Sequence, residues 1–230
     1  AEIDAALSSA AATYLETTLT GGDVIGLSSW SATWLAAIEQ LPAFRTCVAS
    51  RVVQLFGGAG HPGVQVKTTR LIDLLARATG AEPVFFPSPA VLGSAAAAEQ
   101  LMKDPGVGRV MMLLPTVTIA LVGIGGLEPS ALLRESGNMT TAEDAVELRA
   151  EGAVGDVCLR FFDADGAPVR SSYDARLVGA DADQIRAIPR RVAAAGGERK
   201  RAAIRGALRG GWVNVLITDV HTARDLLGEA

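Results

Sequence analysis

Hydroxyl side chains and a lysine are the residues of this sequence whose types and positions best suit the binding of an anion. Ser29, Ser31 and Thr33 follow an apolar run at residues 23–27 and stand where a helix is expected to begin. Backbone N–H groups at a helix start carry a partial positive charge, which suits a phosphate. Ordinary capping of the helix is the alternative role for these hydroxyls.

Lys200 is a second candidate for contact with an anion. It follows the glycine pair at 196–197, in the first turn of an expected helix. A lysine there opposes the helix dipole, so its position favours a bound anion that neutralises it. Arg199 and Arg201 flank it, and a solvated basic face is the alternative.

Two carboxylates, Asp156 and Asp219, are candidates for holding sugar hydroxyls, because a carboxylate is a strong acceptor of hydrogen bonds. Asp219 could instead cap the last helix. The chain has two histidines and two cysteines, and they form no cluster in the sequence. We therefore expect no metal site.

Glycines follow several of the apolar runs. They allow backbone N–H groups to approach a ligand closely, although a tight turn alone would also explain them. The candidate positions are Gly57, Gly58, Gly123, Gly125 and Gly197. The spacing at residues 123–126 does not match a dinucleotide fingerprint and no P-loop occurs, so we expect no cofactor.

The elements that must position these residues alternate between β-branched runs and helical patterns. This alternation predicts an α/β fold with a mainly parallel sheet flanked by helices. We expect strands at residues 23–27, 51–56, 83–86, 116–122, 190–194 and 213–218, and helices at 2–20, 31–41, 65–79, 95–103, 107–114, 197–209 and 219–227. Ligands bind beyond the carboxyl ends of such strands, where the candidate residues lie.

Residues 156–162 are expected to form one further strand, followed by a hairpin turn at 163–166. Together they predict a small antiparallel insert over residues 156–188. Hydrophobic residues make up 49% of the chain and the net charge is -4. The first value predicts a packed core, and the second offers no electrostatic footprint for nucleic acid. No apolar run is long enough to span a membrane and no leader is recognisable, so we expect a cytoplasmic protein without a membrane partner.

Several segments, in this order, resemble the effector-binding domain of the SorC/DeoR-type sugar-responsive transcription regulators of bacteria. They are IGLSSWSATW, VVQLFGGAG, VQVKTTRL, IALVGIGGL, GAVGDVCLRFFDADGAPV, IPRRVAAAGGERKRAAIRGALRGG and VNVLITDVHTARDLL. The resemblance implies a fold similar to the ribose-5-phosphate isomerase and glucosamine-6-phosphate isomerase group. Residues 1–22 would form an N-terminal helix and linker, and residues 23–230 the effector-binding domain.

The resemblance also assigns site residues by motif position. It places Ser29, Ser31 and Thr33 in a phosphate loop, Lys200 after the paired glycines, Gly57, Gly58 and Gln65 in a second pocket wall, and Asp156 and Asp219 facing sugar hydroxyls. The first loop departs from the family pattern of Trp-Gly-basic-Thr, because it contains Ser31 and Ala32. This loss of a basic side chain favours a monophosphate or a neutral polyol. Residues 113–115 offer no lysine for a Schiff base.

The function implied by the resemblance is that of a sensor and not of an enzyme. Members bind a phosphosugar and thereby control DNA binding by an N-terminal helix-turn-helix segment, which is absent from this chain. The resemblance also implies a homodimer or homotetramer. The alternative is a sugar-phosphate isomerase in which Asp156 or Asp219 serves as general base.

Overall fold

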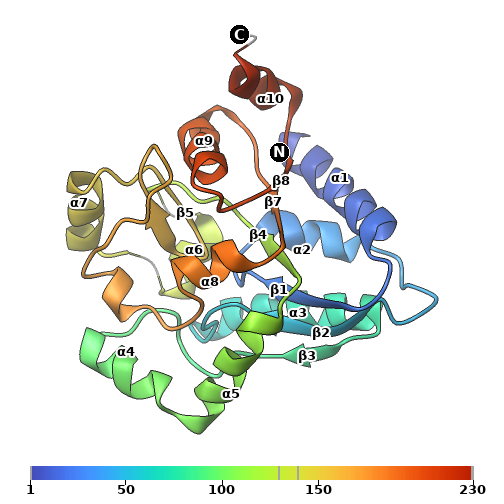
Figure 1. The fold of residues 1–230 in the computed structure, drawn as a ribbon, viewed down its shortest axis with the longest axis horizontal. Helices are drawn as coiled ribbons and strands as arrows, with labels where there is room; N and C mark the ends of the chain where they lie inside the picture. The colour runs from blue at the N-terminus through green and yellow to red at the C-terminus, as the bar shows by residue number, and fades with distance from the viewer. Residues whose placement is uncertain (1, 129, 139, 229–230) are drawn as a thin grey trace.

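The protein is built on a six-stranded parallel sheet with the strand order β3-β2-β1-β4-β7-β8 (Figure 1). The computed structural model describes residues 2–128, 130–138 and 140–228. The strands are β1 (Asp23–Leu27), β2 (Ala49–Gln54), β3 (Glu82–Val84), β4 (Ile119–Val122), β7 (Arg190–Ala194) and β8 (Val215–Ile217). The chain moves outward from β1 to β3 and returns to place β4 on the other side of β1. The strand order therefore reverses between β1 and β4, the position at which open α/β sheets bind ligands.

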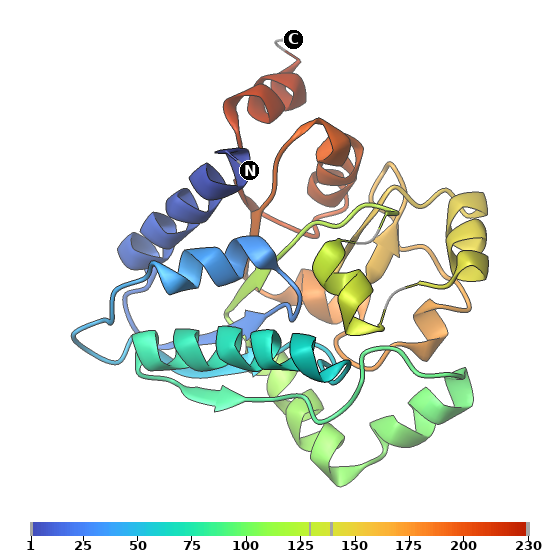
Figure 2. The same ribbon diagram turned by 180° about the vertical axis from the view of Figure 1, so that it is seen from behind.

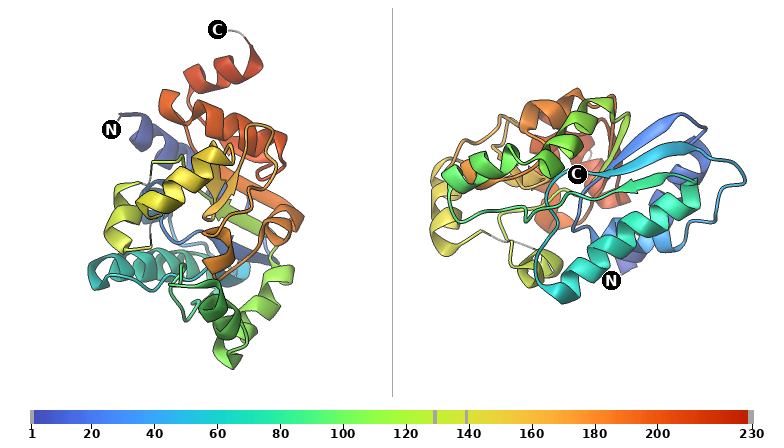
Figure 3. Two further views of the ribbon diagram at one scale, coloured as in Figure 1. Left: turned by 90° about the vertical axis from the view of Figure 1, so that its left-hand side faces the viewer. Right: turned by 90° about the horizontal axis from the view of Figure 1, so that it is seen from below.

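Helices cover both faces of this sheet. They are α1 (Glu2–Thr18), α2 (Ala32–Glu39), α3 (Pro62–Thr79), α4 (Ala95–Met102), α5 (Pro105–Leu113), α6 (Ala131–Ser136), α7 (Ala142–Ala150), α8 (Ala182–Ala187), α9 (Arg201–Arg209) and α10 (Val220–Leu227). Short 3₁₀ turns occur at η1 (Leu114–Thr116), η2 (Asp174–Arg176) and η3 (Glu198–Lys200). Figure 2 shows α1, α2 and α3 together on one face, and Figure 3 shows the sheet between this layer and the elements of the other face.

The hydrophobic core is divided between the two faces because strand side chains alternate. Ile25 and Leu27 of β1 pack with residues of α1, α2 and α3. Val24 lies in the second core, which includes residues of α4, α5, α8 and α9. The predicted α/β class is thus confirmed, and both faces of the sheet are covered.

Strand β4 is shorter than the sequence pattern predicted. Thr116, the first residue of the expected strand, belongs to the turn η1, and β4 begins only at Ile119. The N–H of Val117 closes this turn by donating to the carbonyl of Leu114 at 3.1 Å, so it is not used in the sheet. Thr118 is used differently, since its hydroxyl accepts a hydrogen bond from the backbone N–H of Val24 at 3.1 Å.

The prediction of one continuous strand at residues 156–162 was wrong. This stretch is a hairpin of β5 (Gly155–Val157) and β6 (Arg160–Phe162), which pair antiparallel. Cys158 and Leu159 make the turn between them with left-handed φ angles of 54° and 64°. Two-residue hairpin turns of this kind normally carry Asn and Gly, and a turn built from Cys and Leu therefore has no recognisable sequence pattern.

The turn expected at residues 163–166 does form. One carboxylate oxygen of Asp163 accepts hydrogen bonds from the backbone N–H groups of Asp165 and Ala167, at 3.0 and 2.9 Å. Gly166 follows with a φ of +82°. The remainder of the predicted insert contains η2 and α8.

Candidate functional site

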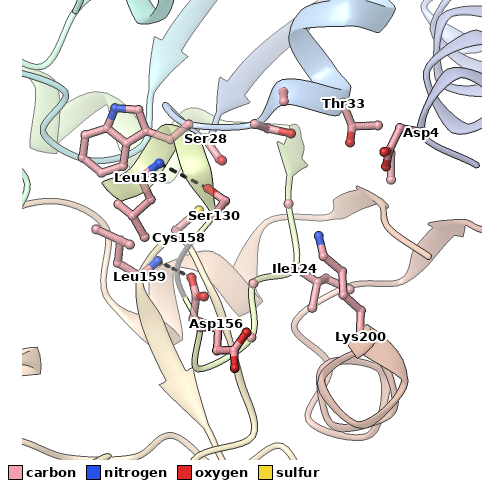
Figure 4. A pocket seen from close by; sticks show the side chains of 18 of the residues that line it. Asp4, Ser28, Thr33, Ile124, Ser130, Leu133, Asp156, Cys158, Leu159 and Lys200 are labelled. Carbon is pink, nitrogen blue, oxygen red and sulfur yellow. Dashed lines mark hydrogen bonds between the residues drawn. The ribbon is translucent and has the colours of Figure 1, made fainter. Parts of the chain in front are cut away.

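A cavity of about 660 Å³ lies at the point where the strand order reverses. The segment that follows β1 forms one wall, and residues 123–128, which follow β4, form another. The β5–β6 hairpin and the turn η3 complete the enclosure (Figure 4). Residues far apart in the sequence therefore meet here because parallel strands end at the same edge of the sheet.

Six of the predicted site residues line this cavity. They are Ser31, Thr33, Gly123, Gly125, Asp156 and Lys200. Ser31 is also the N-cap of α2, where its hydroxyl accepts the backbone N–H of Trp34 at 3.2 Å. The structure thus shows the capping role of this hydroxyl, and the same residue lines the cavity; the binding of an anion by Ser31 stays a prediction.

Four other predicted residues, Ser29, Gly57, Gly58 and Gln65, lie outside the lining of this cavity. The Ser29 hydroxyl is buried, accepts from Nε2 of Gln54 at 2.8 Å and donates to the carbonyl of Phe56 at 3.4 Å. Gly58 and Gln65 line a separate cavity of about 290 Å³. Gly57 is packed against Pro89, whose carbonyl oxygen would be 2.1 Å from an added Cβ.

Asp219 and Gly197 also lie outside the lining. One carboxylate oxygen of Asp219 caps α10 by accepting the N–H of Thr222 at 2.9 Å. The other accepts the N–H of Gly197 at 2.8 Å and the hydroxyl of Thr222 at 2.7 Å. Partial burial opposes ionisation, but the hydrogen bonds from Thr222 and Gly197 outweigh it and lower the pKa of Asp219 to about 2. Asp219 therefore fixes the loop that leads to Lys200.

Asp156 is a buried carboxylate on the wall of the cavity. Burial raises its pKa to about 6, while a hydrogen bond from Leu159 and the charge of Lys200 oppose this rise. The Leu159 N–H donates to Oδ2 at 2.9 Å (Figure 4). Gly125 pairs with Asp156 through two backbone hydrogen bonds, and an added Cβ there would lie 2.0 Å from Oδ1. The carboxylate can keep this position only because residue 125 has no side chain.

Lys200 ends the turn η3 and extends into the cavity (Figure 4). Its side chain is half-buried, and this burial lowers the pKa of its amino group, while Asp156 and Asp4 favour the charged form. Within the part of the chain that the structure describes, its amino group takes part in no hydrogen bond or ion pair. A half-buried cation without a direct partner is a favourable place for an anion.

Sequence reasoning missed a large part of the cavity wall. Asp4 and Ser8 reach it from α1, and Leu159 and Tyr173 reach it from the hairpin region. Leu159 lies in the quoted segment GAVGDVCLRFFDADGAPV, but Asp4, Ser8 and Tyr173 belong to no such segment, and all four residues follow no strand of the main sheet. The signal that could have found them is spatial, because α1 packs beside α2 and thereby reaches the end of β1.

A cavity at the switch point of a parallel sheet, with a lysine and hydroxyl groups on its wall, defines an α/β domain that binds a small polar molecule. Comparison with known proteins makes this class more specific. Residues 1–228 match the Sugar-bind family, which is described as a sugar-binding domain. The chain belongs to this family, whose members here are domains of DeoR- and SorC-type transcriptional regulators, and the resemblance seen in the sequence is thereby confirmed.

Two curated relatives illustrate the match. The deoxyribonucleoside regulator of Bacillus subtilis (strain 168) is 35% identical over 97% of this chain and 70% of its own length. The transcriptional regulator LsrR of Klebsiella pneumoniae is 32% identical over 91% of this chain and 62% of its own length. This chain thus spans about two thirds of the length of regulators that it matches, and both relatives are named as regulators rather than enzymes.

Solved structures show the same fold. A sugar-binding domain of the transcriptional regulator DeoR from Pseudomonas syringae is 38% identical, with a TM-score of 0.74 over 97% of this chain and 84% of that one. The full-length sorbitol operon regulator SorC from Klebsiella pneumoniae has a TM-score of 0.84 at 26% identity, over 98% and 73% of the two chains.

Across the residues described, no helix meets the length and apolarity needed to cross a membrane.

Proposed function

We propose that this domain binds a phosphorylated sugar and thereby controls DNA binding by a segment N-terminal to residue 1. The observation that carries the proposal is the amino group of Lys200, which extends into a cavity without a hydrogen-bonded partner among the described residues. The start of α2, with Ser31 and Thr33, lines the same cavity. A cation and helix N–H groups together suit a phosphate.

Asp156 supports binding of the sugar itself. Its Oδ2 accepts the Leu159 N–H, and no described residue donates a hydrogen bond to Oδ1, which can therefore accept one from a hydroxyl group. Glu128 and Asp4 add two further carboxylates to the wall, whereas Lys200 is the single cation among the described lining residues. This balance of charges favours one phosphate and several hydroxyl groups over a bisphosphate.

We further propose that the protein acts in the bacterial cytoplasm and that it forms a homodimer or homotetramer. Its support is membership of the family and the acidic net charge of -4, which suits a sensor better than a DNA-binding surface. Light scattering of the purified chain with and without ligand measures the oligomeric state, and a monomer under both conditions would contradict this part.

Isothermal titration against sugar phosphates tests the main proposal. The panel contains ribose 5-phosphate and glucosamine 6-phosphate, with deoxyribose 5-phosphate and sorbitol 6-phosphate added because two relatives are named for deoxyribonucleosides and sorbitol. Lys200→Ala is expected to weaken binding by about 5- to 150-fold, as for the loss of a charged hydrogen bond of about 1–3 kcal/mol. Arg209→Ala is the matched control, since Arg209 is an exposed cation paired with Asp165. Absence of binding to every member would refute the proposal.

A sugar-phosphate isomerase is the second candidate, favoured by one observation. A general base works best when its pKa is near the working pH, and the buried Asp156 has a pKa of about 6. Turnover of ribose 5-phosphate or glucosamine 6-phosphate that Asp156→Asn abolishes would establish this activity. Binding without turnover would instead support the sensor.

A further inference from the structure

The first turns of α1 form part of the cavity wall. Asp4, Ala5 and Ser8 line the cavity beside Thr33 of the neighbouring helix α2. Figure 4 shows Asp4 next to Thr33, and Lys200 pointing from the opposite wall toward this end of the cavity. The N-terminal helix is thus a component of the ligand site and not only a cover for the sheet.

The charges on the two sides of this end are opposite. Lys200 is half-buried, and Asp156 and, to a smaller extent, Asp4 favour the charged form of its amino group. A phosphate bound by Lys200 would bring about −1.5 to −2 elementary charges into the same space. Because like charges repel, the phosphate and the Asp4 carboxylate would compete for the same cation.

The packing of α1 allows its first turn to respond to this competition. The buried contacts of the helix begin at Leu7 and continue at Ala11 and Leu15, which are 5%, 0% and 0% exposed. Residues 3–6 are exposed. The turn that carries Asp4 can therefore loosen while the rest of the helix stays packed on the core.

We propose that Asp4 responds to the anionic group of the effector. A bound phosphate takes the place of the Asp4 carboxylate as a negative charge near Lys200, and the first turn of α1 loosens as a result. Any segment that precedes residue 1 is continuous with this turn and receives its movement. The step that involves phosphate rests on the proposed function, whereas the coupling of Asp4 to Lys200 in the ligand-free protein does not.

The ligand-free protein provides the first test. In an α-helix the N–H groups of Leu7 and Ser8 donate to the carbonyls of Ile3 and Asp4, so their hydrogen exchange reports on the first turn. Lys200→Met is expected to speed this exchange about two- to fivefold, the effect of losing the attraction between two partly exposed charges that are not in direct contact. In a protein that already carries Asp4→Asn, the Lys200→Met substitution should not change the exchange rate further. Arg209→Met is the control and should leave the exchange unchanged. Equal exchange in the Lys200→Met variant and the wild type would overturn the coupling.

Ribose 5-phosphate and ribose provide the second test, by titration and by exchange. Asp4→Asn is expected to strengthen binding of ribose 5-phosphate about two- to fivefold and to leave binding of ribose unchanged, because only the phosphate repels Asp4. Saturating ribose 5-phosphate should speed exchange at Leu7 and Ser8 in the wild type. Weaker phosphate binding by Asp4→Asn would mean that Asp4 holds a hydroxyl group, which overturns the proposal. Coupling in the first test without binding of any sugar phosphate would refute the proposed function and the phosphate step, and would leave the link between Asp4 and Lys200 standing.

Discussion

The buried carboxylate of Asp156 makes a sharp prediction about stability and pH. In the folded protein its pKa is raised from 3.8 to about 6, chiefly because burial disfavours the charged form. Below about pH 4 the Asp156 carboxyl group is protonated in both the folded and the unfolded state, so its pKa shift does not lower the free energy of unfolding. Between about pH 4 and 6 the unfolded chain releases this proton while the folded protein retains it, so stability falls as the pH rises.

The magnitude follows from the two pKa values. One pKa unit corresponds to about 1.4 kcal/mol, so a rise from 3.8 to about 6 costs the folded state at most about 3 kcal/mol above pH 6. Asp156→Asn removes the charge but keeps an oxygen that can accept the Leu159 N–H, which donates at 2.9 Å in the native protein. We therefore expect the variant to match the wild type near pH 3.5 and to exceed its stability by up to about 3 kcal/mol at pH 8.

Urea denaturation followed by tryptophan fluorescence at several pH values measures this difference. Subtracting the two curves cancels every titration that the variant and the wild type share. Asp183→Asn, at an exposed position of α8, is the control for replacing a carboxylate by an amide. A flat difference for Asp156→Asn would show that the carboxylate is better solvated by the cavity than its burial indicates, and would refute the reasoning.

Two further substitutions test how the site is positioned. Gly125→Ala should reduce sugar-phosphate affinity in calorimetry by tenfold or more, on the order expected for loss of a charged hydrogen bond, because its Cβ would lie 2.0 Å from Oδ1 of Asp156. Gly93→Ala, outside the cavity lining and with nothing within 4 Å of an added Cβ, should bind normally; equal affinities in both variants would contradict this role of Gly125. Asp219→Ala should lower the free energy of unfolding by about 1–2 kcal/mol through loss of the α10 cap, and Asp219→Asn by less. Since the pKa of Asp219 is lowered to about 2, its stabilising effect should be present above about pH 4 and disappear as the pH falls toward 2; an acid titration of stability that is the same with and without Asp219 would exclude it.

The parallel sheet and one part of the site could be predicted from the sequence for the same physical reason. Buried parallel strands give continuous apolar runs, and their carboxyl ends meet at one edge of the sheet. This principle correctly brought Ser31, Gly123 and Lys200 to one cavity. It could not give the strand order, because the pattern of runs does not record which strands are neighbours.

Other parts of the site depend on directions that a sequence does not record. Ser28 and Ser29 are adjacent, yet Ser28 lines the cavity while Ser29 is hydrogen-bonded to Gln54. The approach of α1 to the site depends on its packing against α2. A cavity wall that a packed helix supplies has no local sequence pattern, and Asp4 was missed for this reason.

The turn at Cys158 and Leu159 lowers the stability of the domain, while its two side chains form part of the cavity wall. Left-handed backbone at a residue with a side chain costs about 1–2 kcal/mol, and both residues adopt it, with φ angles of 54° and 64°. Both side chains also line the cavity. Selection for thermal stability alone would favour Asn and Gly at these two positions and would remove part of the cavity wall. Laboratory evolution of this domain toward heat resistance should therefore select substitutions at Cys158 and Leu159 early. These substitutions should weaken ligand binding.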